Sequence, residues 1–252
     1  MYLGQQVTFL LSLPCNYYKT STLLPFRSDT AILLFSRTAV EESLSKPLAA
    51  AHSKAKKAIA TQLIRHARGI AKGSGLPVFI VSGHRQCGGK FGECFAYAFE
   101  RFFERGFERV ISIGNDCPAL TSKDIVEAAN RLDTAAYVFG PASDGGAYLV
   151  GMRREEYDPT FFRQISWQTP LVLSELKAWA DDDYYCLEEK SDVDSPADLW
   201  RVLHSAAIPV LLRIKLFLAL TCSLPSGFSQ TTFGLPMAFS DCRALRGPPH
   251  LA

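Results

Sequence analysis

Two aspartates of this sequence each follow a predicted strand, where their side chains could bind a cation. The apolar, β-branched run at residues 110–113 is typical of a buried strand and stops at a turn that contains Asp116. A similar run at residues 137–139 leads into a loop with Asp144. Ligands of open parallel α/β sheets bind beyond the carboxyl ends of the strands, and carboxylates there suit a hard cation and a phosphorylated substrate. A role for Asp116 as a mere turn cap stays open.

The residues that follow these aspartates predict how they are held. Thr121 and Asp124 have the spacing of a capping box, so we expect a helix to begin at Thr121. The loop that carries Asp144 continues into Gly145 and Gly146, which allow a positive φ or the close approach of a ligand to the backbone. Each aspartate therefore has its own turn, and one helix separates the two turns.

The rest of the chain alternates predicted strands and helices. Residues 31–36 form a continuous apolar run, which we expect to be the first central strand. Arg37 follows directly, where a guanidinium could bind phosphate groups or pair with a nearby carboxylate. Ser195, Pro196 and Asp198 form a strong helix start. Further strands are predicted at residues 76–81, 147–152 and 184–187, and further helices at residues 50–72, 95–103 and 169–180.

The composition excludes several classes of protein. The chain has 252 residues, a formal net charge of +2, and 48% apolar and 21% charged residues. These values indicate one globular domain and give no case for nucleic acid as a bulk electrostatic partner. The apolar run at residues 208–220 is shorter than the roughly 20 residues of a bilayer span. We therefore expect a packed or interfacial helix there and no stable membrane insertion.

The cysteines and the first residues bear on the cellular compartment. Seven scattered cysteines without a C-x-x-C pair indicate neither a zinc site nor a disulfide framework. Each is expected to be a small buried residue or an inert thiol, as in a reducing cytoplasm. The apolar run at residues 7–13 has no Lys or Arg before it and precedes Pro14, so an irregular leader is favoured over a secretion signal. We predict a cytoplasmic protein.

Six segments carry a resemblance to a known family: IGNDCPAL (113–120), GPASDGGAYLVG (140–151), FSR (35–37), FGE (91–93), ISW (165–167) and DVDSPADL (192–199). They closely resemble an uncharacterised bacterial family in the GT-A glycosyltransferase superfamily, one branch of which is linked to arsenosugar biosynthesis. The resemblance covers residues 30–204. It implies an α/β fold, a single Rossmann-like GT-A (nucleotide-diphospho-sugar transferase) domain with a mostly parallel central sheet flanked by helices. Residues 1–29 would be an irregular leader and residues 205–252 a C-terminal extension of uncertain structure.

The resemblance also implies a binding site for a metal ion and a nucleotide. Asp194 matches a residue that is a second metal ligand in related nucleotidyltransferases, so Asp116 and Asp194 would together hold a divalent cation, Mg or Mn. Magnesium usually takes only one or two protein carboxylates and completes its shell with phosphate oxygens and water. Arg37, Lys46 and Asp116 are the expected nucleotide and phosphate ligands.

A second group of residues is expected at the sugar or the acceptor. The resemblance and the loop position assign Asp144, Gly145 and Gly146 to this end of the site, and Asp144 is the candidate general base. Trp167 could line the acceptor pocket, although an indole in this setting is more often a core residue with one wet edge.

The sequence departs from the family pattern at three cations. A Lys-Thr-Arg-Leu signature after the first strand falls on Ser45, Lys46, Pro47 and Leu48, so that both family cations are replaced. Lys46 lies between the two vacated positions and could substitute as a point charge, but it cannot form the two parallel bonds of an arginine. Cys94 likewise stands where the family has an arginine.

Three functions remain open from the sequence. The favoured one is a metal-dependent glycosyltransferase with a nucleoside-diphosphate sugar donor and an unknown small-molecule acceptor. The first alternative is a nucleotidyltransferase of the same fold, which joins an NTP to a phosphorylated or cofactor acceptor. Such enzymes use a glycine-rich basic loop after the first strand, and residues 38–48 contain no glycine. The second alternative is a catalytically inactive binding protein that has kept the fold.

Overall fold

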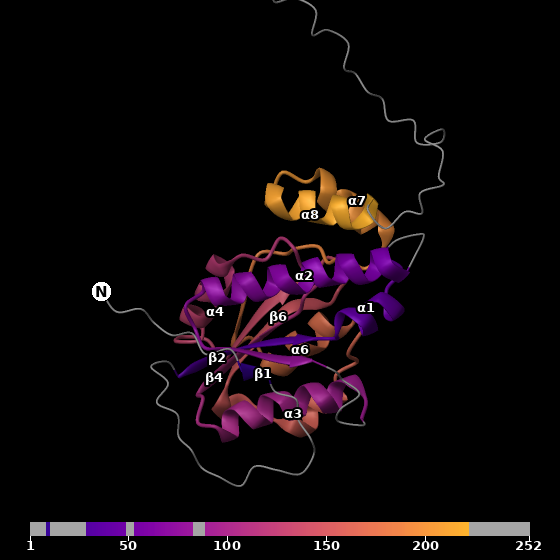
Figure 1. Ribbon diagram of the computed structural model, residues 1–252. Coiled ribbons are helices and arrows are strands. Elements are labelled where there is room, and N and C mark those ends of the chain that lie inside the picture. The colour runs from indigo at the N-terminus through magenta and orange to yellow at the C-terminus, as the bar shows by residue number, and fades with distance from the viewer. Residues whose placement is uncertain (1–8, 11–28, 49–52, 83–88, 222–252) are drawn as a thin grey trace, which may run out of the picture.

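The computed structural model describes residues 9–10, 29–48, 53–82 and 89–221. Most of the predicted leader, residues 83–88 and the end of the predicted C-terminal extension lie outside the described residues. Within the described ranges the chain folds into one seven-stranded sheet with helices on both faces (Figure 1).

The sheet is mixed but mostly parallel, as the sequence predicted. Its strand order is β1-β3-β2-β4-β6-β5-β7. Strand β6 pairs antiparallel with β4 and β5, and the other neighbouring pairs are parallel. The strands are β1 (Phe9–Leu10), β2 (Thr30–Ser36), β3 (Val78–Ser82), β4 (Arg109–Ile113), β5 (Tyr137–Pro141), β6 (Ala147–Arg153) and β7 (Tyr184–Cys186).

The helices form layers on either side of this sheet. In Figure 1, α2 lies above the sheet and α3 below it, while α7 and α8 lie outside α2. The sequence did not predict α1 or α5, and α6 begins three residues later than expected. The helices are α1 (Ala39–Ser45), α2 (Ser53–Gly73), α3 (Phe91–Glu104), α4 (Ser122–Arg131), α5 (Pro159–Gln164), α6 (Val172–Ala180), α7 (Pro196–His204) and α8 (Val210–Thr221).

The continuous apolar run of β2 reflects burial on both faces of the sheet. Successive side chains of a strand point to opposite faces. Leu33 and Phe35 belong to the core on the α3 side, whereas Ile32 and Leu34 belong to the core on the side of α2 and α4. All seven residues of β2 are buried. A central strand of this kind needs no polar face, which is why its sequence does not alternate.

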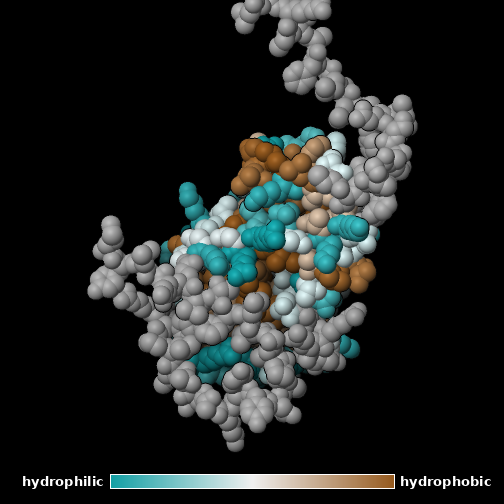
Figure 2. Space-filling model, viewed as in Figure 1, coloured by the Kyte–Doolittle hydropathy of each residue, from teal (hydrophilic) through white to brown (hydrophobic). Residues whose placement is uncertain are grey.

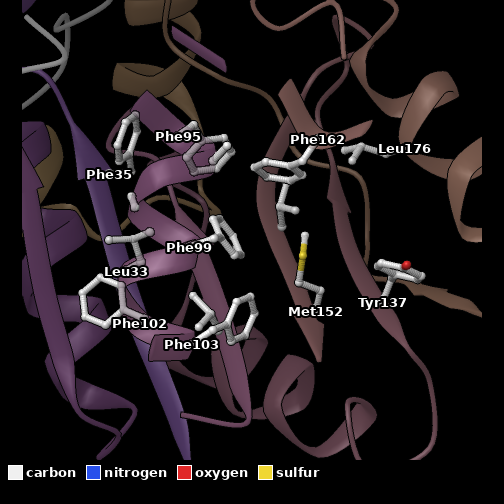
Figure 3. Packing of buried hydrophobic residues seen from close by; sticks show 14 of the residues in the cluster. Leu33, Phe35, Phe95, Phe99, Phe102, Phe103, Tyr137, Met152, Phe162 and Leu176 are labelled. Carbon is white, nitrogen blue, oxygen red and sulfur yellow. The ribbon is translucent and has the colours of Figure 1, made fainter. Parts of the chain in front are cut away.

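The core on the α3 side is aromatic. Phe95, Phe99, Phe102 and Phe103 form a stripe on α3, and Phe162 of α5 packs against them (Figure 3). The rings of Phe99 and Phe162 lie 5.1 Å apart between centroids. This packing fixes α3 against the sheet and holds α5 against α3.

The last described helix packs on one face only. Leu212 and Leu216 of α8 are buried in a cluster with α2 and α7. Five large apolar side chains on the rest of α8 are exposed, and Figure 2 shows hydrophobic surface at that end of the molecule. No helix in the described ranges is both long and apolar enough to cross a membrane. The exposed side chains are Val210, Leu211, Ile214, Phe217 and Leu218.

The expectation that each cysteine is a small buried residue or an inert thiol, with no disulfide indicated, is wrong at Cys94. Cys94, at the start of α3, is disulfide-bonded, whereas Cys117 and Cys186 are free. Scattered spacing carries no information on which cysteines come together in space, so the sequence could not have shown this.

We expect Phe99→Ala to destabilise the fold by about 3–5 kcal/mol, because it removes a completely buried ring and leaves a cavity. Tyr97→Ala on the same helix is the matched control, since Tyr97 is 41% exposed, and it should cost far less. Urea unfolding of both variants measures the difference. Equal losses of stability would show that the aromatic stripe is not the core of this layer.

Candidate functional site

A cavity of about 400 Å³ lies beyond the carboxyl ends of β2 and β4. Its size is that of a small-molecule site. The start of β6 reaches the same edge, because β6 runs antiparallel to β4 and pairs Leu149 with Ile113. Seven of the eight residues that the sequence singled out line this cavity, and Gly145 lies next to a lining residue. The seven are Arg37, Lys46, Asp116, Asp144, Gly146, Trp167 and Asp194.

Lys46 lies between two of the predicted carboxylates. Its ammonium is 2.7 Å from Asp116 Oδ2 and 2.7 Å from Asp194 Oδ1. The Lys46 side chain is only 14% exposed. Burial alone would lower the pKa of Lys46, but the negative charges of Asp116, Glu42 and Asp194 raise it above its ordinary value. Lys46 therefore stays protonated and bridges the two carboxylates.

A main-chain hydrogen bond brings Asp116 and Asp194 to the same place. The backbone N–H of Val193 donates to the carbonyl of Asp116 at 2.8 Å, so that the segment before α7 lies against the end of β4. Ser195 then caps α7 in a capping box with Asp198, as predicted, which fixes where the helix begins. Asp194 is thereby held one residue before the cap, with its carboxylate at the cavity.

Arg37 stands at the end of β2, as the sequence predicted. Its Nη1 donates to the hydroxyl of Ser45 at 3.0 Å, so α1 and the strand end are joined across the turn. Thr38 and Glu41 form a capping box that starts α1. Ser45, where the resemblance implied a family cation, instead orients the arginine. A guanidinium has five N–H donors, so most remain for a ligand.

The turn between β5 and β6 holds Asp144 through its own backbone. The N–H of Gly146 donates to Asp144 Oδ1 at 2.9 Å. Gly145 has a φ of +89°, and a Cβ there would lie 2.3 Å from the carbonyl oxygen of Pro170. Glycine is therefore required at residue 145 for the backbone, while Gly146 and Asp144 face the cavity.

Trp167 is both a core residue and part of the cavity wall. Its ring packs against Phe91, Phe95 and Phe162, at centroid distances of 5.9, 4.9 and 4.9 Å. Its Nε1–H donates to the carbonyl of Phe162 at 2.8 Å, so the polar edge of the indole is already satisfied. The indole can therefore offer a ligand its ring surface but not its N–H.

Two further acids, which were not predicted from the sequence, also line the cavity. Desolvation, reinforced by the charges of Asp116, Asp144 and Asp194, raises the pKa of Asp192 to about 8. Desolvation also raises the pKa of Glu42, which is only 4% exposed. Among the described residues, neither Asp192 Oδ1 nor Glu42 Oε2 has a hydrogen-bond partner.

Of these two acids, Asp192 could have been selected from the sequence and Glu42 could not. Asp192 stands two residues before Asp194, and this spacing puts both side chains on one side of an extended segment. Glu42 gave no signal, because α1 was not predicted.

The predicted divalent cation can be tested against these contacts. A cation shared by Asp116 and Asp194 would need the space in which the Lys46 ammonium lies. Within the described parts of the chain, no group of three or more His, Cys, Asp or Glu side chains is placed to hold a metal ion. The position of the Lys46 ammonium therefore does not fit a cation held between these two carboxylates.

Comparison with known proteins gives the family of the chain. Residues 41–169 match the family model described as "Uncharacterized protein conserved in bacteria (DUF2064)". The chain belongs to this family. This agrees with the resemblance to an uncharacterised bacterial family that the sequence segments indicated. No curated protein matches the chain.

One solved structure confirms the fold of this DUF2064 chain, and two others have lower similarity. A structure described as a "putative nucleotide-diphospho-sugar transferase" from Desulfovibrio desulfuricans G20 has a TM-score of 0.59 and 18% identity, over 77% of this chain and 97% of that one. A CMP:2-keto-3-deoxy-manno-octonic acid synthetase complexed with CTP has a TM-score of 0.42 and 15% identity, over 69% and 97%. The inositol-1-phosphate CTP transferase of T. maritima has a TM-score of 0.39 and 10% identity, over 76% and 96%. At 18% identity the first structure shows the fold alone, and no conclusion is drawn from the other two.

We expect Gly145→Ala to be more destabilising than Gly106→Ala. Comparing the two variants separates the cost of a positive φ from the cost of a steric clash. Both glycines have positive φ, which costs an alanine about 1–2 kcal/mol. A Cβ at residue 106 would meet nothing within 4 Å, whereas a Cβ at residue 145 would also collide with Pro170. Urea midpoints of the two variants measure the difference. Equal midpoints would mean that the turn beside Asp144 adjusts freely.

Proposed function

We propose that this DUF2064 protein is a transferase that binds a nucleoside-diphosphate sugar in the cavity and passes the glycosyl group to an acceptor. The observation that carries the proposal is that one cavity at the carboxyl edge of the sheet joins two cations, Arg37 and Lys46, with the aspartates and an aromatic wall. Such an edge is where α/β sheets bind nucleotides. The fold shared with the D. desulfuricans structure supports the same class.

The two ends of the cavity suit the two ends of such a donor. Arg37 and Lys46 stand together beyond β2, where their charges can meet the diphosphate. Asp144 and Gly146 of the β5–β6 turn and the ring of Trp167 line other parts of the wall. Carboxylates and aromatic ring faces are groups that bind sugars, so we place the glycosyl group there.

Asp144 is the candidate base for the transfer. An inverting transfer needs a group that takes the proton of the acceptor hydroxyl as the acceptor oxygen bonds to the sugar carbon and the bond from that carbon to the diphosphate breaks, which releases the nucleoside diphosphate. Asp144 Oδ1 accepts the N–H of Gly146, and this bond holds the carboxylate at the cavity wall. Its second oxygen can face an acceptor.

The proposed donor site includes no divalent cation between Asp116 and Asp194, because the ammonium of Lys46 lies there. The link of one family branch to arsenosugar biosynthesis stays a prediction, and we propose no particular acceptor.

We expect one class of nucleoside-diphosphate sugar to bind the wild-type protein, and Arg37→Met to weaken that binding at least about tenfold, or about 1.4 kcal/mol. Calorimetric titration with UDP, GDP, CDP and dTDP sugars measures it. Arg65→Met is the matched control, because Arg65 is exposed on α2 and does not line the cavity. It should change the binding free energy by less than about 0.5 kcal/mol.

The same titration separates the rival functions. Tight binding of an NTP and not of a nucleotide sugar would favour nucleotidyl transfer, the first alternative from the sequence. An absence of nucleotide binding would contradict the proposal and favour a protein that has kept the fold without the activity.

We expect Asp144→Asn to lower turnover by about 10²- to 10⁴-fold while donor binding is retained, because an amide cannot take up the proton. Slow hydrolysis of the bound donor, with water as acceptor, gives a readout that needs no knowledge of the natural acceptor. Asp158→Asn at the N-cap of α5 is the control, since asparagine caps equally well and Asp158 lies outside the cavity wall. Unchanged hydrolysis in the Asp144 variant would remove this residue from the chemistry.

A further inference from the structure

Two ion pairs hold the Lys46 ammonium at the cavity wall. Its ammonium makes two ion pairs of 2.7 Å, with Asp116 from the end of β4 and with Asp194 from the segment before α7. Charge-assisted bonds of this length are strong, and the low exposure of Lys46 reduces solvent screening most for the pair with Asp116, since the Asp194 side chain is 50% exposed. The two carboxylates therefore share one cation that belongs to the chain itself.

We propose that Lys46 is the resident cation of this site and takes the position between Asp116 and Asp194 that the sequence assigned to a divalent metal ion. This inference rests on the proposed function, because it names the group that meets the diphosphate of the donor. An ammonium has three N–H donors. Two of them go to the carboxylates, and the third remains for a phosphate oxygen.

The local sequence holds Lys46 in this position. Lys46 is the C-cap of α1, and its backbone N–H donates to the carbonyl of Glu42. Pro47 disfavours a helical conformation in the residue before it, and Lys46 is extended, with φ −110° and ψ 135°. Leu48 is 1% exposed and packs in the cluster with α2 and α8. The lysine backbone is thus fixed on both sides.

This geometry gives a physical reason for each departure from the family signature. Ser45 replaces one family cation and accepts a hydrogen bond from Arg37. Pro47 replaces the other and ends α1 at Ser45. Lys46 is then the cation of this segment, and a divalent ion could reach the carboxylates only by displacing an ammonium that is tethered beside them.

The test measures Mn²⁺ binding by calorimetry and by the EPR signal of free Mn²⁺, with no nucleotide present. We expect the wild-type protein to show no Asp116-dependent binding at millimolar Mn²⁺. Lys46→Met should create a site, because it leaves two uncompensated carboxylates side by side, and its affinity should exceed that of the wild type at least about tenfold. The double variant Lys46→Met with Asp116→Asn should lose that site again.

A charge-preserving variant keeps the test decisive if the methionine variant does not fold. Lys46→Arg should exclude Mn²⁺ as the wild type does, because it keeps a cation between the carboxylates. Asp116-dependent binding of Mn²⁺ by the wild-type protein would overturn the proposal. An absence of binding in a folded Lys46→Met variant would overturn it as well, since Lys46 would then not occupy a cation position.

The nucleotide titration distinguishes this inference from the proposed function. We expect a nucleoside-diphosphate sugar to bind the wild-type protein equally well in EDTA and in Mn²⁺. Binding that requires Mn²⁺ would overturn the role of Lys46 and leave the transferase proposal standing. Failure of every nucleotide sugar to bind would overturn the transferase proposal, while the Mn²⁺ result in the nucleotide-free variants would still decide whether Lys46 occupies the cation position.

Discussion

The ion pairs of Lys46 join three segments that are far apart in the sequence. Lys46 follows α1, Asp116 follows β4, and Asp194 precedes α7. The sheet brings the first two together, because β2 and β4 are parallel neighbours whose carboxyl ends meet at one edge. The hydrogen bond from Val193 to Asp116 adds the third. The cavity depends on this convergence, since these residues form one side of its wall.

The hydrophobic layers make this polar edge possible. Both faces of β2 are buried, one by the aromatic stripe of α3 and the other by α2 and α4. Burial of this kind supplies most of the free energy of folding and leaves the polar strand ends to function. The site is therefore held by a rigid scaffold, while its charged side chains contribute little to the core.

The parts of the fold that the sequence predicted are those fixed by local chemistry. The apolar runs of β2 and β4 and the capping boxes at Thr121 and Ser195 each need only a few neighbouring residues, and the structure confirms them. The short helix α1 was missed, since its seven residues have no extended apolar stripe. The bridge made by Lys46 could not be predicted either, because it depends on the distance between segments that only the folded sheet brings together.

The burial of acids also bears on how this acidic cavity could accept the anionic donor that we propose. Five acids and two cations line it, which would repel a diphosphate if every acid were ionised. Desolvation raises the pKa of Asp192 to about 8, so this carboxyl is mostly protonated at neutral pH, and it raises the pKa of Glu42 as well. Lys46 is shared by Asp116 and Asp194, and Arg37 adds a second positive charge. The depth at which the fold places each acid therefore sets the charge that a ligand meets.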